Sequence, residues 1–323
     1  MRRTTTSVLV VLLSAALAGQ SYVPARVFGG PKHQLTDLEA LLADAAGADV
    51  VFVGEDHDDA NTHRLERVLL EGLARRRGDI VLALEMFERD VQEPFDHFQM
   101  GHVDEADFLR EARPWDRYAT FYKPLVDFAI DHRWPVVAAN VPRAIAAEVA
   151  ASGLDVLAKK SPEEQAWFAR ERQCPLQGDF FKRFREAMSD HDSPSAKPSS
   201  SEQAMDRYYF AQCLKDETMG ESIAQAYAGL AIGGKRPLVV SINGDFHTDF
   251  RGGLVERTAR RLPDKRLVIV TIQAVRDVDR PTSTSEDRKR ADYIIYTTAR
   301  PPAPPPTAPR GAAPSAGSSS SAR

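Results

Sequence analysis

Residues 49–59 read DVVFVGEDHDD, an apolar run rich in β-branched residues that ends in a glycine and a series of charged side chains. An apolar run without polar interruption is typical of a strand that is buried on both faces. Strands of this kind belong to parallel sheets that are covered by helices. The change to acidic residues and a histidine marks the carboxyl end of the strand, where such sheets bind their ligands.

Four further runs of the same type follow along the chain: Asp79–Leu84 (DIVLAL), Pro135–Ala139 (PVVAA), Pro237–Ile242 (PLVVSI) and Arg266–Ile272 (RLVIVTI). Between the runs, the segments Thr62–Arg77 and Tyr118–His132 carry apolar residues at helical spacing. This alternation of strands and helices predicts an α/β fold in which helices sandwich a mostly parallel sheet.

The interval 161–230 breaks this alternation, because it contains no strand-like run. We expect a helical insertion subdomain at one edge of the sheet, within a single domain that spans residues 35–298. Its expected elements are a polar loop, His191–Ser201, and the helices Pro162–Arg172, Gly178–Ser189 and Glu202–Leu230.

Both cysteines of the chain, Cys174 and Cys213, fall in this interval. In an exported protein they are candidates for a disulfide, and the sequence leaves that pairing open because their separation in space is unknown. Two cysteines are too few for a disulfide scaffold or a four-cysteine zinc site.

The N-terminus has the pattern of a secretory signal peptide over residues 1–18. Arg2 and Arg3 precede an apolar run, Val8–Ala18, which is shorter than the roughly 20 residues that span a bilayer. Gly19 and Gln20 stand where a lipoprotein would need its acceptor cysteine. We therefore expect an exported, periplasmic or extracellular protein that is not a lipoprotein; the alternative is an uncleaved N-terminal anchor.

The composition excludes some classes of function. Residues 299–323 consist mainly of Pro, Ala, Ser and Gly, and this composition predicts a disordered tail. The formal net charge of the chain is −4, and without the two ends it is −9, from 37 basic against 46 acidic residues. An acidic balance of this kind gives no electrostatic basis for binding nucleic acid.

Ionisable residues stand at the predicted carboxyl ends of three strands: Glu55 and His57 after the first, Glu85 after the second, and Asp245 and His247 after the fourth. Because the carboxyl ends of parallel strands lie along one edge of a sheet, we expect these residues to converge on one pocket. Asn140 and Arg143 follow the third strand, and they are further candidates for binding a cofactor there.

Two of these stretches share the pattern Gly-x-x-His, from Gly54 to His57 and from Gly244 to His247. A glycine at a strand end permits the tight turn that directs the histidine back to the sheet edge. A third match, from Gly30 to His33, is interpreted as a coincidence because it follows no such strand.

Two histidines with several carboxylates suit a divalent metal ion that holds and activates a water molecule. The predicted ligands are Glu55, His57, Glu85, Asp245 and His247. In a metal-free alternative, a carboxylate orients one histidine as a general base. In a third interpretation, both histidines only form hydrogen bonds with the sheet edge.

The remaining aromatic and histidine residues are first interpreted as structural. Trp115, Tyr118 and Tyr122 have helical spacing and are expected in the core, although either phenol could reach into the pocket; Tyr208 and Tyr209 allow the same two interpretations. The histidines expected to be solvated are His63, His97, His102 and His132. In a further interpretation, His191 closes over a site from its polar loop. A surface and capping cluster is expected from Glu88, Arg89 and Asp90.

Several separated blocks of the sequence together resemble the ChaN family. They are VGEDHDDANTHRLERVLL (53–70), LALEMFERDVQ (82–92), WDRYATFYKPLVDFA (115–129), PVVAANVPR (135–143), AQCLKDETMGESIAQAY (211–227) and INGDFHTDFRGGL (242–254). The resemblance covers roughly residues 35–273, in the family's order. ChaN proteins are haem-binding proteins of the bacterial envelope, in a superfamily with the Tiki metalloproteases and the erythromycin esterases.

The resemblance implies haem as a cofactor, bound through a tyrosine phenolate with histidines nearby, and a homodimer that sandwiches two haems. Its tyrosine candidates are Tyr118, Tyr122, Tyr208 and Tyr209. A phenolate ligand favours ferric iron. The implied function is haem or iron acquisition or storage, with outer-membrane haem or iron transport machinery as a partner.

The Tiki relatives imply the alternative function, a hydrolase that depends on a divalent metal such as Mn²⁺, Zn²⁺ or Co²⁺. The residues that correspond to its motifs are Glu55, His57 and His247, with Glu85 as a further candidate. The esterase relatives imply a metal-free hydrolase with His57 or His247 as the base. This sequence departs from many ChaN proteins in lacking the lipid-acceptor cysteine and in carrying the Pro/Ala-rich tail.

Overall fold

The structure, a computed structural model, describes residues 22–30, 32–190, 202–281 and 283–299. The predicted signal peptide, the loop His191–Ser201 with His191, and residues 300–323 of the predicted tail lie outside these ranges. None of the helices within the ranges is long and apolar enough to cross a bilayer.

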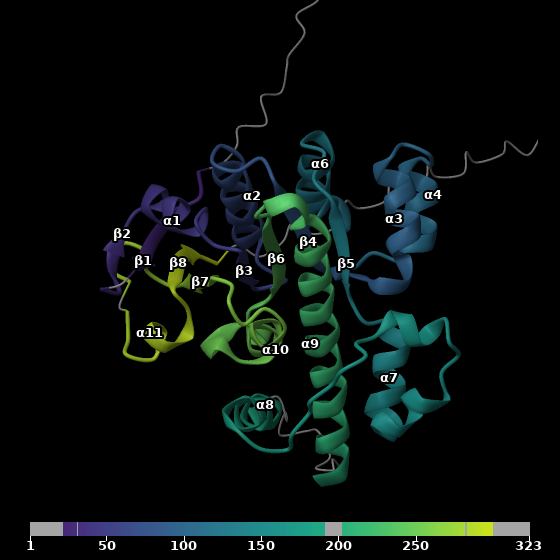
Figure 1. Cartoon of the computed structure of the whole chain (residues 1–323). Coiled ribbons are helices and arrows are strands. Elements are labelled where there is room, and N and C mark those ends of the chain that lie inside the picture. Colours follow the sequence, from purple (N-terminus) through teal and green to yellow (C-terminus); the bar gives the residue numbers. More distant parts are fainter. Residues whose placement is uncertain (1–21, 31, 191–201, 282, 300–323) are drawn as a thin grey trace, which may run out of the picture.

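One sheet runs through the described part of the chain, in the spatial order β2-β1-β8-β7-β3-β6-β4-β5 (Figure 1). Its strands are β1 (Ala25–Gly29), β2 (Gln34–Thr36), β3 (Val50–Glu55), β4 (Ile80–Glu88), β5 (Val136–Asn140), β6 (Leu238–Gly244), β7 (Leu267–Val275) and β8 (Tyr293–Thr298). From β8 to β5 all neighbours pair in parallel, whereas β1 is antiparallel to both β8 and β2. The predicted fold class, a mostly parallel α/β sandwich, is confirmed.

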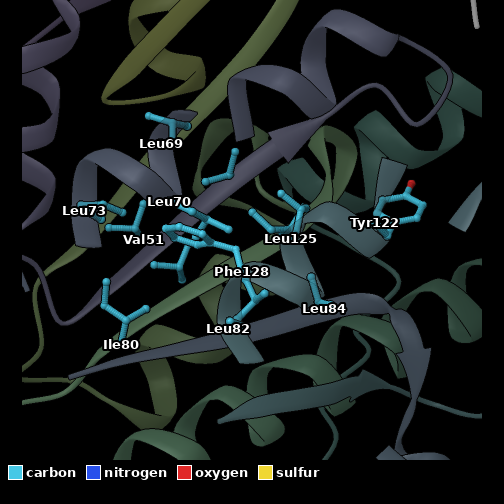
Figure 2. Close-up of a cluster of buried hydrophobic side chains, with 14 of the residues drawn as sticks. Val51, Leu69, Leu70, Leu73, Ile80, Leu82, Leu84, Tyr122, Leu125 and Phe128 are labelled. Carbon is cyan, nitrogen blue, oxygen red and sulfur yellow. The ribbon is translucent and has the colours of Figure 1, made fainter. Parts of the chain in front are cut away.

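The first face of the sheet is covered by α1 (Leu38–Ala45), α2 (Ala60–Ala74), α5 (Tyr118–Phe121) and α6 (Lys123–Asp131). Alternate strand residues point to this face: Val51, Leu82 and Leu84 pack against the leucines of α2 and against Leu125 of α6, as Figure 2 shows. Each fully buried leucine of this kind contributes about 1.5–3 kcal/mol. The pattern explains why the strands read as continuous apolar runs, because their other residues are buried on the opposite face.

The second face is covered by the C-terminal half of α9 (Glu202–Leu230) and by α10 (Gly253–Arg261). Met219, Ile223 and Tyr227 of α9 pack on Val50 and Phe52 of β3 together with neighbouring strands. The helix α9 therefore covers the edge strand β5 and its neighbours β4 and β6. The apolar residues of its last turns are buried against these strands.

The N-terminal half of α9 extends past the carboxyl ends of the strands (Figure 1). There it packs against α7 (Arg143–Ser152) and α8 (Asp179–Asp190). The shorter elements are α3 (Gln92–Gln99), α4 (Glu105–Ala112) and α11 (Asp287–Arg290), and the 3-10 turns η1 (Arg89–Val91), η2 (Leu154–Lys159), η3 (Glu164–Trp167), η4 (Ile232–Gly234), η5 (Asp245–His247) and η6 (Asp249–Arg251).

The predicted helix Pro162–Arg172 is wrong, since only the short turn η3 forms there. Backbone N–H groups that a helix would pair internally instead donate to side chains of α9: Ala169 to Thr218, Arg170 to Glu221 and Gln173 to Glu217. These hydrogen bonds hold the segment along α9. It then continues into Cys174, which the structure joins to Cys213 of α9 in a disulfide.

Candidate functional site

Three neighbouring strands, β3, β6 and β4, place ionisable side chains at one edge of the sheet. The ladder pairs Glu55, the last residue of β3, with Gly244, the last residue of β6. On the other side of β6, the Glu85 Oε2 atom accepts a hydrogen bond of 2.8 Å from the Gly244 N–H. The parallel pairing thus brings together residues that lie nearly 200 positions apart in the chain.

Gly244 is the point at which the two histidines approach each other. A β-carbon at this position would lie 2.8 Å from His57 Nε2 and 3.7 Å from His247 Cδ2, so a larger residue would displace the His57 ring. Its φ of −55° is an ordinary value, and the requirement for glycine here is therefore one of space. The structure thus brings His57, His247, Glu55 and Glu85 together, as the sequence predicted.

His57 is held by Glu55 and faces outward. Its Nδ1 lies 2.5 Å from Glu55 Oε1, and the Tyr122 hydroxyl donates to the same oxygen at 2.9 Å. Burial disfavours the charged imidazole, but the hydrogen bond and charge of Glu55 and the charge of Glu85 outweigh it and raise the pKa of His57. The side chain is 39% exposed, which leaves it accessible to a ligand.

His247 lies between two carboxylates and is buried. Its Nε2 is 3.2 Å from Glu85 Oε1, and its Nδ1 is 2.5 Å from Asp216 Oδ1. Burial alone would lower the pKa of His247, but the charges of Glu85 and Asp216 raise it to about 10. Conversely, His247 and His57 overcome the effect of burial on Glu85 and lower its pKa to about 2. His247 is therefore an imidazolium at neutral pH.

The sequence did not identify two groups that α9 contributes to this site. Asp216 is fully buried, and Gln212, one turn earlier, has its Nε2 3.1 Å from His247 Nδ1. Both residues lie in a charged helical segment, a pattern that is typical of a solvent-exposed helix surface. The signal that could have found them is the block AQCLKDETMGESIAQAY (211–227), which resembles the ChaN family and contains both residues.

Three predicted site residues have other roles in the structure. Asp245 forms no hydrogen bond or ion pair with His57 or His247 within the described ranges; burial raises its pKa, and the charges of Arg290 and, more weakly, His57 oppose the shift. Asn140 Nδ2 donates to the Glu85 carbonyl at 3.1 Å, which fastens β5 to β4. The exposed Arg143 forms an ion pair of 3.3 Å with Glu88.

The predicted surface cluster of Glu88, Arg89 and Asp90 is only partly correct. Glu88 is buried, and Arg89 donates to the Thr218 carbonyl and to the Ser222 hydroxyl of α9. Arg89 therefore joins the end of β4 to the long helix, whereas Glu88 pairs with Arg113 and Arg143.

The prediction that His63 is solvated is wrong. Its side chain is 3% exposed and stacks on Phe121 with ring centroids 4.0 Å apart. The Nδ1 atom faces two buried carboxylates, Glu66 Oε2 at 3.1 Å and Glu55 Oε2 at 3.5 Å. Burial raises the pKa of Glu66 to about 7, and burial together with the charge of Glu66 raises that of Glu55. The first turns of α2 point into the strand ends rather than to solvent, whereas His97, His102 and His132 are exposed as expected.

The four candidate tyrosines differ in access. Tyr118 packs edge-on against Phe87, Tyr122 bonds to Glu55, and Tyr209 lies among Phe180, Phe181 and Phe184. Burial raises the pKa of Tyr118, Tyr122 and Tyr209, with nearby acidic groups adding to the shift for Tyr118 and Tyr122. Tyr208, by contrast, is 44% exposed.

Comparison with known proteins identifies the family. A family model described as "Haem-binding uptake, Tiki superfamily, ChaN" matches residues 41–258. The match covers more than half of the chain, and the chain therefore belongs to the ChaN family of haem-binding proteins, as the motifs indicated.

Two individual relatives are similar over most of this chain. The solved structure of ChaN from Campylobacter jejuni, described with cofacial haem binding, has a TM-score of 0.61 and 15% identity; the match covers 85% of this chain and 97% of that one. Protein RETICULATA-RELATED 5, chloroplastic, from Arabidopsis thaliana is 26% identical over 297 residues. That match takes in 86% of this chain but spans only 38% of the plant protein's length.

Proposed function

We propose that this chain is an exported haem-binding protein of haem or iron handling, in which Tyr208 supplies the axial ligand to the iron. The observation that carries the proposal is the position of Tyr208 on α9. Tyr208, Gln212 and Asp216 are spaced four residues apart, and residues at this spacing share one face of a helix. Gln212 and Asp216 both contact His247, so Tyr208 lies one turn, about 6 Å, further out on the same face.

The other three tyrosines fit this role less well. A phenolate ligand requires loss of the phenol proton, which burial and nearby carboxylates oppose at Tyr118 and Tyr122. Tyr209 is buried among phenylalanine rings, and its phenol is therefore less accessible to a porphyrin than that of Tyr208. Tyr208 is exposed, and from its position the outward-facing His57 could serve the second side or the propionates of a haem.

The proposal extends to location and assembly. A disulfide within the family domain fits an oxidising compartment such as the periplasm, in agreement with the signal-peptide pattern. A ligand carried on an exposed helix face also suits a homodimer in which two haems stack between subunits, the cofacial arrangement described for the Campylobacter jejuni protein. Outer-membrane haem or iron transport machinery would then be the source or recipient of the haem.

The test is a hemin titration followed by absorption spectroscopy. Tyr208→Phe should shift the Soret band, remove the phenolate charge-transfer feature and weaken binding by at least 10-fold. The matched control is Tyr209→Phe, the adjacent but buried tyrosine, which should leave the spectrum unchanged. An unchanged spectrum in Tyr208→Phe, or a changed one only in Tyr209→Phe, would contradict the assignment of the ligand.

A second candidate function, hydrolysis, is favoured by the His57–Glu55 pair. A carboxylate that orients an accessible imidazole is the arrangement of a general base. The metal-dependent form would place the ion among His57, His247, Glu55 and Glu85, and it would require His247 to give up its proton. Peptide and ester substrates, assayed with and without Mn²⁺, Zn²⁺ or Co²⁺, distinguish the two forms, and loss of turnover in His57→Ala is the expected result for both.

A further inference from the structure

A second group of ligand-type atoms lies behind His57, on the inner side of Glu55. Glu55 ends β3, while His63 and Glu66 stand three residues apart on the first turns of α2. Their ligand atoms lie within 4.8 Å of one another, and all three side chains are at most 3% exposed. This group shares only Glu55 with the His57–His247 cluster.

The hydrogen bonds of His63 fix the direction of its lone pair. His63 Nε2 lies 3.1 Å from the carbonyl oxygen of His57, which can only accept, so Nε2 carries the proton. In the neutral ring Nδ1 is then unprotonated, and its lone pair is directed at Glu55 Oε2 and Glu66 Oε2. Three electron-rich atoms then face one another, an arrangement that a bound cation, or a proton on one of the carboxyl groups, stabilises.

The remaining polar atoms of the group support the same conclusion. Glu55 Oε2 and Glu66 Oε1 are buried and accept no hydrogen bond from the described residues. Burying carboxylates without a donor or a counter-charge is costly. Glu55 Oε1 is already bound by Tyr122 and His57, which leaves Oε2 directed toward the group.

The surroundings orient these residues as the outer shell of a metal site does. A metal-bound histidine usually donates its second N–H to a carbonyl or carboxylate, which fixes its tautomer and orientation. The His57 carbonyl fulfils this role for His63, and stacking on Phe121 holds the ring. Tyr122 donates to Glu55 in the same way.

We propose that Glu55, His63 and Glu66 bind one divalent transition-metal ion in the interior of the protein. One imidazole and two carboxylates suit Mn²⁺, Fe²⁺ or Zn²⁺. The ion neutralises the two carboxylates and fixes Glu55, and through Glu55 it sets the orientation of the outward-facing His57. This proposal does not depend on haem binding at Tyr208, and the site shares Glu55 alone with the His57–His247 cluster.

The experiment uses the full chain after treatment with a chelator and removal of the chelator. Titration with Mn²⁺, followed by electron paramagnetic resonance and by competition with Zn²⁺, should give one site per chain. Glu66→Gln keeps the size of the side chain but removes a ligand charge, and it should weaken Mn²⁺ affinity by about 10- to 100-fold. The midpoint of thermal unfolding should rise by several degrees with saturating metal in the wild type and not in Glu66→Gln.

Two control variants assign the ion to this group. Glu71→Gln, on the exposed part of the same helix, should bind Mn²⁺ as the wild type does. His247→Gln should also bind Mn²⁺ as the wild type does. A metal held at the His57–His247 cluster would instead be lost in that variant. Failure of the wild type to bind Mn²⁺ or Zn²⁺, equal binding in Glu66→Gln, or equal loss in Glu71→Gln or His247→Gln would each overturn the proposal.

Discussion

The two ends of strand β3 carry buried carboxylates in opposite electrostatic states. At the amino end, Asp49 accepts hydrogen bonds from Tyr227, from Arg236 and from the Arg266 N–H. Burial would raise the pKa of Asp49, but these donors hold it below its usual range. At the carboxyl end, Glu55 shares its surroundings with Glu66, and its pKa lies above the usual range.

The difference separates a charge that holds the fold from one that is available to a ligand. Both oxygens of Asp49 already accept hydrogen bonds from the protein, so this carboxylate has no need of a ligand. At the carboxyl end, carboxylates face carboxylates or histidines, and some of their oxygens accept no hydrogen bond. Perturbed and incompletely satisfied groups of this kind gather at functional sites, and the sheet keeps them at a single edge.

The largest effect is expected from Asp49→Asn at the amino end. This change removes the charge that pairs with Arg236 and should lower the free energy of unfolding by about 3 kcal/mol at pH 7. Because the pKa of Asp49 is lowered in the folded state, its stabilisation is present above about pH 4 and is lost as the pH falls below that value. Urea unfolding at pH 7 measures the loss of stability, and the same experiment at pH 3 measures how far that loss depends on the charge of Asp49. The exposed Asp79, changed to Asn, is the control, and an equal loss in that variant would contradict a special role for Asp49.

A smaller effect, with the opposite dependence on pH, is expected from His247→Gln at the carboxyl end. The pKa of His247 is raised to about 10, so the stability it contributes is complete below about pH 6.5 and is lost as the pH rises toward 10. The free-energy difference between wild type and variant should therefore shrink as the pH rises from 6 to 10. Thermal or urea unfolding across that range is the measurement, and a constant difference would show that His247 is not protonated in the folded protein.

The smallest effect is expected from Glu66→Gln in the presence of a chelator. Glu66 is fully buried, yet its Oε1 atom accepts no hydrogen bond and its pKa is raised to about 7. A raised carboxyl pKa costs stability as the pH rises above about 4.5, and glutamine resembles the protonated acid. Without a metal, the change should therefore leave the unfolding free energy at pH 7 unchanged or raise it by about 1 kcal/mol. A loss of unfolding free energy as large as that in Asp49→Asn would show that the charge of Glu66 stabilises the fold, as that of Asp49 does.

The sequence was sufficient for the central strands and for the convergence at their carboxyl ends. Continuous apolar runs mark strands buried on both faces, and parallel pairing then brings His57 and His247 to one edge without further information. The three strands beyond β7 were missed, because β1 and β2 are short and β8 mixes apolar residues with threonines. Their pairing depends on contacts between the two ends of the described chain, which no local pattern encodes.

The groups contributed by helices could not be found in this way. His63, Glu66 and Asp216 stand in charged helical stretches, which usually lie on a solvated surface. They are buried because the start of α2 and the middle of α9 pass directly over the strand ends. Likewise, the N–H groups of Ala169, Arg170 and Gln173 donate to side chains of α9 that lie more than 40 positions away in the sequence. The expected helix does not form there because these groups are already paired.

The pairing of β1 with β8 has a consequence for how the protein reaches its folded state. The Thr297 hydroxyl donates to the carbonyl of Pro24 across 273 positions of sequence, and the two strands form a ladder beside that contact. The ribosome must release nearly the whole described chain before this border of the sheet can close, and contacts of such long range slow folding. A chain whose sheet closes only when synthesis is nearly complete stays open for longer than one that is built from local contacts.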